Sequence, residues 1–453
     1  MDCLGIRRLP YLSRRNFFYE YRHLLFWGVF AGVIEGDFAG VVISKTFHGG
    51  DWLIAIVAST PFAANLLSLA WGMLCAGRRK IPLMARFGVA AATFAAAAGL
   101  APATDLGAIW FLVCVAGAQA LLSGVVTVRT AVWRANYPTQ QRGRITARLQ
   151  RVRAVVGVIM VQMCAAYSDR DPNAYTLVYP AAAVVGLIAM GLLSPIRIRG
   201  EAAGLRASRI DNDSPADESL VEPFSLAAVL SPGRSLRRMS EILRDDRRYA
   251  RYCLAQSIHG ISNLITLPVV VAIVTREIDF GYAGGFWVST VLVVALPTMA
   301  LLGSLDRWGR LFDAIGVLRF RMVNIGSWAA SYAFGLAGTL LAFGGRGSEA
   351  AMFGAVVGLF ACRAFFYGLA QGGGRIAWNI GHLHFSSKDE AEEYMGIHVF
   401  LTGVRGLAAP LLGMWLWHVA GWGVWLVSLT LAAVSMGMFA SLAREEQKTP
   451  GTT

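Results

Sequence analysis

Charge is scarce in this sequence. Aspartate, glutamate, lysine and arginine together make up 15% of the 453 residues, well below the roughly 25% that is usual for a soluble globular domain. Hydrophobic residues make up 56%. The apolar residues fall into about a dozen runs of roughly 20, each long enough to cross a hydrocarbon core of about 30 Å as a helix. The composition therefore predicts an all-α polytopic membrane protein.

Several signatures of other protein classes are missing. The six cysteines are scattered and no two have the C-x-x-C spacing, so we expect them to pack as small residues and not to form disulfides or a zinc site. The patterns G-x-S-x-G, H-E-x-x-H and G-x-x-x-x-G-K-[ST] do not occur. We therefore expect a protein that is not an enzyme, carries no cofactor or metal, and does not hydrolyse ATP.

Twelve membrane spans are predicted. They lie at roughly 23–45, 52–75, 82–100, 107–128, 148–167, 175–195, 250–275, 283–304, 320–343, 350–370, 395–417 and 421–442. The first run has no small-residue cleavage site after it, so we expect an anchor and not a removed signal peptide.

The long polar segment after the sixth span divides the chain into two halves, because it is too polar to form a core of its own. The predicted parts are an N-terminal tail 1–22, a six-helix half 23–195, a linker 196–249, a second six-helix half 250–442 and a C-terminal tail 443–453.

Arginine and lysine are concentrated in alternate loops. The basic segments are the N-terminal tail, the loops after spans two, four and eight, and the linker. Because cytoplasmic loops carry an excess of these residues, we expect a protein of the cytoplasmic membrane with both termini in the cytoplasm. We also expect it to act as a monomer, in contact with the lipid bilayer and not with nucleic acid.

The two halves carry matching sequences. Gly303-Ser-Leu-Asp-Arg-Trp-Gly-Arg310, at the end of span eight, parallels Gly72-Met-Leu-Cys-Ala-Gly-Arg-Arg-Lys80 at the end of span two. Likewise Arg129-Thr-Ala-Val-Trp133 resembles Arg375-Ile-Ala-Trp378. Repeats that run in the same direction predict two pseudo-symmetric bundles related by an axis along the membrane normal.

The 303–310 segment resembles the loop signature G-x-L-x-D-R-x-G-R of the major facilitator superfamily. The resemblance implies that fold, with a gating motif after spans two and eight. The motif candidates are Gly72, Arg78, Gly303, Asp306, Arg307, Gly309 and Arg310, with Arg129 and Arg375 at the cytoplasmic edge. The copy after span two departs from the pattern because Cys75 stands where the family has an acid, which weakens the expected latch there.

In this superfamily spans one, four, seven and ten line a central cavity. Span four carries Gln119 and Ser123 on one helix face, and span ten carries Arg363 and Tyr367 at the same spacing. Aligning Tyr21 with Tyr249 places Glu35 of span one at Asn263 of span seven, and His259 is four residues before Asn263. We interpret these six residues, Gln119, Ser123, His259, Asn263, Arg363 and Tyr367, as substrate-cavity candidates. The alternative interpretation is that they join helices by hydrogen bonds.

Glu35 and Asp37 lie within the first span, where a charge costs about 2.5 to 3.5 kcal/mol at the helix centre. They are our candidates for proton coupling, and a static structural pairing is the alternative. The two are separated by about 200° on an ideal helix, so both face one cavity only if the helix is distorted. The flanking Gly32, Gly36 and Gly40 permit a distortion, although such glycines also serve for close packing.

Charged cytoplasmic segments have simpler interpretations. The arginine-rich run 134–153 is typical of a loop lying on anionic lipid headgroups. The acidic segment 389–393 follows His382 and His384, whose spacing is not diagnostic of a metal site.

These features favour a secondary active transporter of a small solute that works by alternating access and is coupled to protons. The alternative is a non-transporting protein of the same fold, an assembly or delivery factor that docks a partner through its charged cytoplasmic loops. The loss of the motif acid at Cys75 favours the alternative.

Overall fold

The computed structural model describes residues 11–35, 37–75, 78–202, 205, 233–278, 285–344, 349–385 and 391–448. All the regular structure in these residues is helical. Their contacts divide the chain into two compact units. Unit one holds the described residues of 1–39, 64–164 and 173–233, and unit two holds those of 40–63, 165–172 and 234–453.

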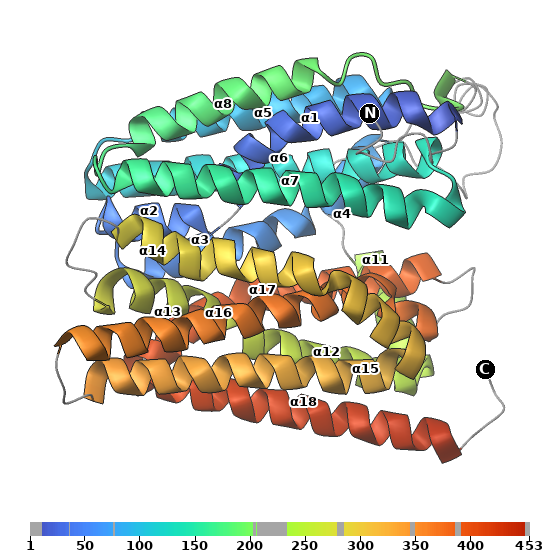
Figure 1. The fold of residues 1–453 in the computed structure, drawn as a ribbon. Coiled ribbons are helices and arrows are strands. Elements are labelled where there is room, and N and C mark those ends of the chain that lie inside the picture. The colour runs from blue at the N-terminus through green and yellow to red at the C-terminus, as the bar shows by residue number, and fades with distance from the viewer. Residues whose placement is uncertain are drawn as a thin grey trace. The chain divides into compact units, whose positions relative to one another are not determined.

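The described part of unit one is built from six helices (Figure 1). α5 packs against both α6 and α8, and α1 packs against α8. The helices are α1 (Tyr11–Glu35), α4 (Ser68–Cys75), α5 (Lys80–Ala98), α6 (Asp105–Asn136), most of α7 (Thr139–Ser168) and α8 (Tyr175–Gly191).

Unit two contains the remaining helices. α15 packs against α16 and α18, and α12 packs against α17 and α18. The elements are most of α2 (Phe38–Lys45) and of α3 (Asp51–Leu66), α11 (Gly233–Asp245), α12 (Arg247–Leu264), α13 (Thr266–Ala272), α14 (Gly285–Thr290), α15 (Leu296–Gly344), α16 (Glu349–Ile380), α17 (Ala391–Ala420) and α18 (Gly423–Lys448), with the π-helices η3 (Ile273–Glu277) and η4 (Val291–Ala295) and the 3₁₀ turn η5 (Gly381–His384).

Most of the described residues in each predicted span are helical, and the chain is a multi-pass membrane protein. In the described ranges eight helices are long and apolar enough to cross a membrane, or nine if α1 and α2 form one broken span. The predicted total of twelve, the division into halves and the orientation stay predictions. Most of the predicted linker, 203–204 and 206–232, lies outside the described residues.

Span nine and the end of span eight lie within α15, whereas the earlier described part of span eight lies in α14 and η4. The helix α15 changes direction at Gly316. This residue has φ 72° and ψ 169°, a conformation that favours glycine. The 303–310 motif, expected in a loop, is therefore helical, and its Trp308 is buried against Phe320 and Ala377. Trp308 Nε1 donates a hydrogen bond to the carbonyl of Leu369 at 2.8 Å, so the motif fixes α15 against α16.

Glycines allow α1 and α7 to cross at close range in unit one. A Cβ atom on Gly32 would lie 2.7 Å from the Cα of Gly157, and one on Gly28 would lie 2.9 Å from the carbonyl oxygen of Arg153. Backbone atoms cannot move aside as a flexible side chain can, so Gly32 has a close-packing role.

We predict that Gly32→Ala lowers the free energy of unfolding by about 1 to 3 kcal/mol, because the added methyl group forces α1 and α7 apart. The measurement is thermal unfolding of the purified protein. Gly191→Ala, at a helical position with no atom within 4 Å of the added Cβ, is the control. Equal melting temperatures for the two variants would contradict the proposed crossing.

Candidate functional site

The first membrane span is interrupted where its acids lie. α1 ends at Glu35 and α2 begins at Phe38, so the two acids do not lie on one continuous helix. The last carbonyls of a helix have no partner within the helix, and Gln119 Nε2 donates to the carbonyl of Ile34 at 2.9 Å. Gln119, which is only 5% exposed, therefore supports the end of α1.

Glu35 forms an ion pair within unit one. Arg153 on α7 donates from Nη1 to Glu35 Oε2, and both side chains are about one quarter exposed, 24% for Arg153 and 28% for Glu35. Arg153 lies both in the arginine-rich run 134–153 and in predicted span five, and it is helical, within α7. Asp37 is half-buried at the interruption.

A second acid of α1, Glu20, was missed because it lies in the predicted tail. It is 4% exposed, and Trp133 Nε1 donates to its Oε2 at 2.6 Å. Its other oxygen, Oε1, has no hydrogen-bond partner. Glu20 lines a small pocket together with His23 and Arg129. The spacing of three residues between Glu20 and His23, which places both on one helix face, is the signal that could have found it.

Arg129 and Arg375, which match in sequence, have different environments. Arg129 is buried, contacts His23 Nε2 at 3.1 Å from Nη2, and lies 5.7 Å from the centre of the Trp27 ring. Arg375 is exposed. Most of the other motif candidates are also exposed, and Gly309 is half-buried; the exposed ones are Gly72, Arg78, Gly303, Asp306, Arg307 and Arg310.

On α16, Arg363 and Tyr367, which are four residues apart, contact each other on one helix face. The guanidinium of Arg363, a residue only 3% exposed, lies 4.5 Å from the centre of the Tyr367 ring. The Tyr367 hydroxyl accepts from Gln371 Nε2 at 2.8 Å. In α6, Ser123 Oγ accepts from Trp71 Nε1 at 2.9 Å, so Ser123 joins α6 to α4.

His259 and Asn263 lie on α12 with different exposure. His259 is 2% exposed, packs edge-on against Trp328 with ring centres 5.6 Å apart, and has no partner for Nδ1. Asn263 is half-buried, and its carbonyl accepts from Thr266 Oγ1 at 2.8 Å.

His382 and His384 have different surroundings. His382 is buried, and burial lowers the pKa of its imidazole below the usual value. His384 Nε2 lies 3.1 Å from Glu446 Oε1. Among the described residues no group of three or more histidine, cysteine or acidic side chains is placed to hold a metal ion; residues 386–390, which include Asp389 and Glu390, lie outside them.

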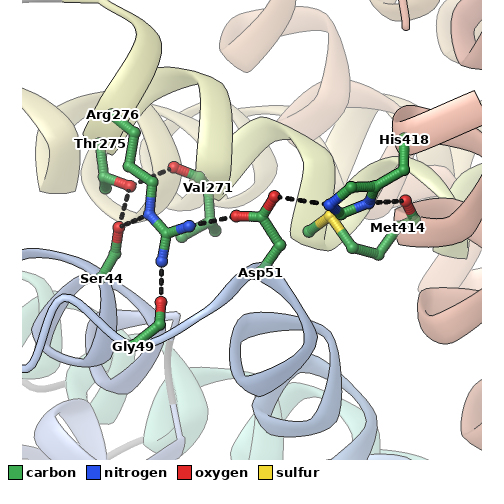
Figure 2. A network of polar contacts seen from close by, with 8 residues as sticks. All are labelled: Ser44, Gly49, Asp51, Val271, Thr275, Arg276, Met414 and His418. Carbon is green, nitrogen blue, oxygen red and sulfur yellow. Dashed lines mark hydrogen bonds and ion pairs between the residues drawn. The ribbon is translucent and has the colours of Figure 1, made fainter.

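Unit two contains a polar network around Asp51 (Figure 2). Arg276 of η3 donates from Nη1 to Asp51 Oδ1 and from Nη2 to the carbonyl of Gly49. Its Nε donates to Ser44 Oγ at 2.9 Å. The second Asp51 oxygen, Oδ2, lies 3.2 Å from Nε2 of His418 on α17.

Two further contacts hold the ends of this network. Ser44 Oγ and Thr275 Oγ1 are 2.6 Å apart, and the His418 ring stacks on Trp52 with ring centres 5.9 Å apart. The segment 44–52, from the first predicted half, is thereby joined to η3 and α17 of the second. The sequence did not indicate these contacts, because no motif surrounds Asp51 or Arg276.

Solved structures with the same fold are transporters. The chain matches a mutant form of the nucleoside transporter NupG at a TM-score of 0.66 and 14% identity, covering 95% of this chain and 99% of that one. It matches a POT family transporter in complex with 5-aminolevulinic acid at a TM-score of 0.66 and 11% identity, covering 98% of this chain and 100% of that one. It matches the xylose transporter XylE from E. coli at a TM-score of 0.57 and 12% identity, covering 97% of this chain and 99% of that one.

No protein-family model and no curated protein sequence matches the chain. At these identities the structural matches establish the fold, which is that of the major facilitator transporters.

We predict that Asp51→Asn lowers the free energy of unfolding by about 1 to 3 kcal/mol, because the guanidinium of Arg276 loses its carboxylate. Arg276→Gln should cost a similar amount. Since the two residues form one pair, the double variant should cost less than the sum of the single changes. Thermal unfolding of the four proteins measures this coupling, with Asp105→Asn at an exposed helix start as a control. Additive effects would show that the two residues do not interact.

Proposed function

We propose that the protein is a secondary active transporter that moves a small solute across the cytoplasmic membrane by alternating access, coupled to protons. Its fold supports this class of function, because the solved structures it resembles are transporters of nucleosides, sugars and peptides. The observation that carries the proposal is the Glu35–Arg153 pair at the interruption of the first span. A membrane helix that needed only to span the bilayer would gain nothing from an acid at that place.

The ion pair provides a way to couple the carboxyl to a proton gradient. Coupling requires a carboxyl that is ionised in one state and neutral in another. A nearby cation favours the ionised form, and a low-dielectric environment without one favours the neutral form. Arg153 is such a cation beside Glu35, and a movement that separates the two side chains would remove it.

The Asp51 network would close one end of the pathway. In the proposed orientation both termini are in the cytoplasm. Asp51, Arg276 and His418 then come after spans one, seven and eleven, respectively, on the outer side of the membrane. They connect segments of both repeats within unit two. Breaking these contacts would be required for the cavity to open outward, and remaking them would accompany opening to the cytoplasm.

The cavity candidates have separate roles in this proposal. Arg363 with Tyr367 and the half-buried Asn263 would contact the solute from unit two. Gln119 and Ser123 hold neighbouring helices by hydrogen bonds and would shape the cavity without a contact to the solute. Asp37, half-buried at the interruption, is the second candidate for the coupling proton.

We predict that Glu35→Gln retains solute binding but loses accumulation driven by a proton gradient, because the amide cannot release a proton. A thermal-shift screen with a nucleoside, a pentose, a dipeptide and small carboxylates identifies a solute that stabilises the protein. Uptake of that solute into liposomes is then measured with and without a pH gradient. Asp105→Asn, at an exposed helix start, is the control and should accumulate the solute as the wild type does.

Full gradient-driven uptake in both Glu35→Gln and Asp37→Asn would contradict the proposal that these residues couple transport to protons. Flux of none of these solutes, together with a protein partner that co-purifies in constant ratio, would favour the docking factor over the transporter.

A further inference from the structure

Polar side chains of three helices meet inside unit two, at a place that the proposed transport pathway does not use. On α12, Tyr252 and Gln256 are four residues apart, and Gln256 Nε2 donates to the Tyr252 hydroxyl at 3.0 Å. On α17, His398 and Arg405 are seven residues apart and so share a helix face. On α15, Arg321 follows the turn at Gly316. We call Gln256, Arg321, His398 and Arg405 the cationic cluster.

Arg321 lies where the basic segment after span eight meets the start of predicted span nine, and it is only 4% exposed. It donates from Nη2 to Gln256 Oε1 and from Nη1 to Asn324 Oδ1, the latter at 3.3 Å. Its guanidinium lies 5.7 Å from the centre of the Phe439 ring. Its Nε is buried and has no hydrogen-bond partner.

Arg405 also contacts Gln256, at its backbone carbonyl and not at its side chain. It donates from Nη1 to the carbonyl of Gln256 at 3.0 Å and from Nη2 to Thr402 Oγ1 at 2.9 Å. Its Nε is also buried without a partner. Gly260 makes room for it, because a Cβ atom there would lie 2.3 Å from that Nε.

No described acid forms an ion pair with the cluster. Arginine remains protonated in proteins, and a buried charge is costly unless it is paired. The acids that form ion pairs in the described part of unit two, Asp51, Glu241, Glu445 and Glu446, pair with other residues. Among the described residues, Arg321 and Arg405 contact only neutral groups. Two guanidinium charges therefore remain around Gln256.

The equivalent place in unit one shows that packing does not need these charges. The alignment of Tyr21 with Tyr249 pairs Gly32 with Gly260. At Gly32 the neighbouring helix, α7, contributes Gly157. At Gly260 the neighbouring helix, α17, contributes Arg405. One crossing is glycine on glycine, whereas the other accommodates a guanidinium that has no acidic partner.

We propose that the cationic cluster binds the oxyanion group, carboxylate or phosphate, of an anionic ligand. An oxyanion supplies the missing negative charge, and its oxygens accept from the unpaired donors, Nε of Arg321, Nε of Arg405 and Nε2 of His398, which also has no partner. Guanidinium groups match carboxylates and phosphates in geometry as well as charge. The inference concerns a binding site outside the proposed transport pathway, so it holds or fails independently of transport.

The test is thermal unfolding of the full-length protein in a neutral detergent. Sodium phosphate and sodium succinate are titrated separately, and sodium chloride at equal ionic strength is the reference. We expect a saturable rise in melting temperature of roughly 2 °C or more beyond chloride for at least one oxyanion. A parallel titration compares micelles containing phosphatidylglycerol with micelles containing phosphatidylcholine.

Variants assign the response to the cluster. Arg321→Gln and Arg405→Gln should weaken oxyanion binding by at least about tenfold, since each loses a charge-assisted hydrogen bond. Arg319→Gln, which removes an exposed arginine two residues from Arg321, should bind as the wild type does. Gly260→Ala keeps both charges but displaces Arg405 and should also weaken binding, whereas Gly326→Ala, with open space around the added Cβ, should not.

A response to free phosphate or succinate identifies a soluble anion, and one to phosphatidylglycerol alone identifies a lipid headgroup; both support the site if they are lost in Arg321→Gln. The proposal is overturned if no oxyanion exceeds chloride in the wild-type protein. It is equally overturned if Arg319→Gln and Arg321→Gln lose the response alike, because the effect would then be general electrostatic attraction.

Discussion

The requirement that a charge in an apolar helical bundle be neutralised governs most of the polar structure of this protein. At the centre of a membrane helix such a charge costs about 2.5 to 3.5 kcal/mol. Glu35 meets the requirement through Arg153, and Asp51 meets it through Arg276 and His418. In each case the pair joins elements far apart in the sequence, so neutralising the charge also positions helices. A change of state that separates such a pair must provide another partner or a proton.

The two predicted repeats have similar helix crossings with different charges around them. Each has a glycine on its first helix at equivalent positions, Gly32 and Gly260, which permits a close crossing. The first repeat adds an acid with its cation at an interrupted helix, whereas the second adds cations around Gln256. The charges around the two glycines therefore differ, although the sequence around them aligns.

The sequence predicted the helices well but few of their contacts. Long apolar runs determine the spans, and Glu35 is identified as a candidate because it is an acid inside such a run, whatever its partner. The partner could not be predicted, because Arg153 lies in a basic stretch that also fits a loop at the membrane surface. Arg321 lies at the edge of another basic segment, so its burial could not be predicted either. Glu20 and Asp51 lie at span ends, where acids are common, and their burial depends on tertiary packing that hydropathy does not encode.

Proton movement driven by the solute tests the central claim most directly. The protein is reconstituted into liposomes that contain a pH-sensitive dye, and a solute that stabilises the purified protein is added outside with no ion gradient present. Proton-coupled alternating access predicts a change of internal pH that depends on the solute, saturates with its concentration and is absent from Glu35→Gln liposomes. Solute entry into wild-type liposomes without any change of internal pH would contradict the account.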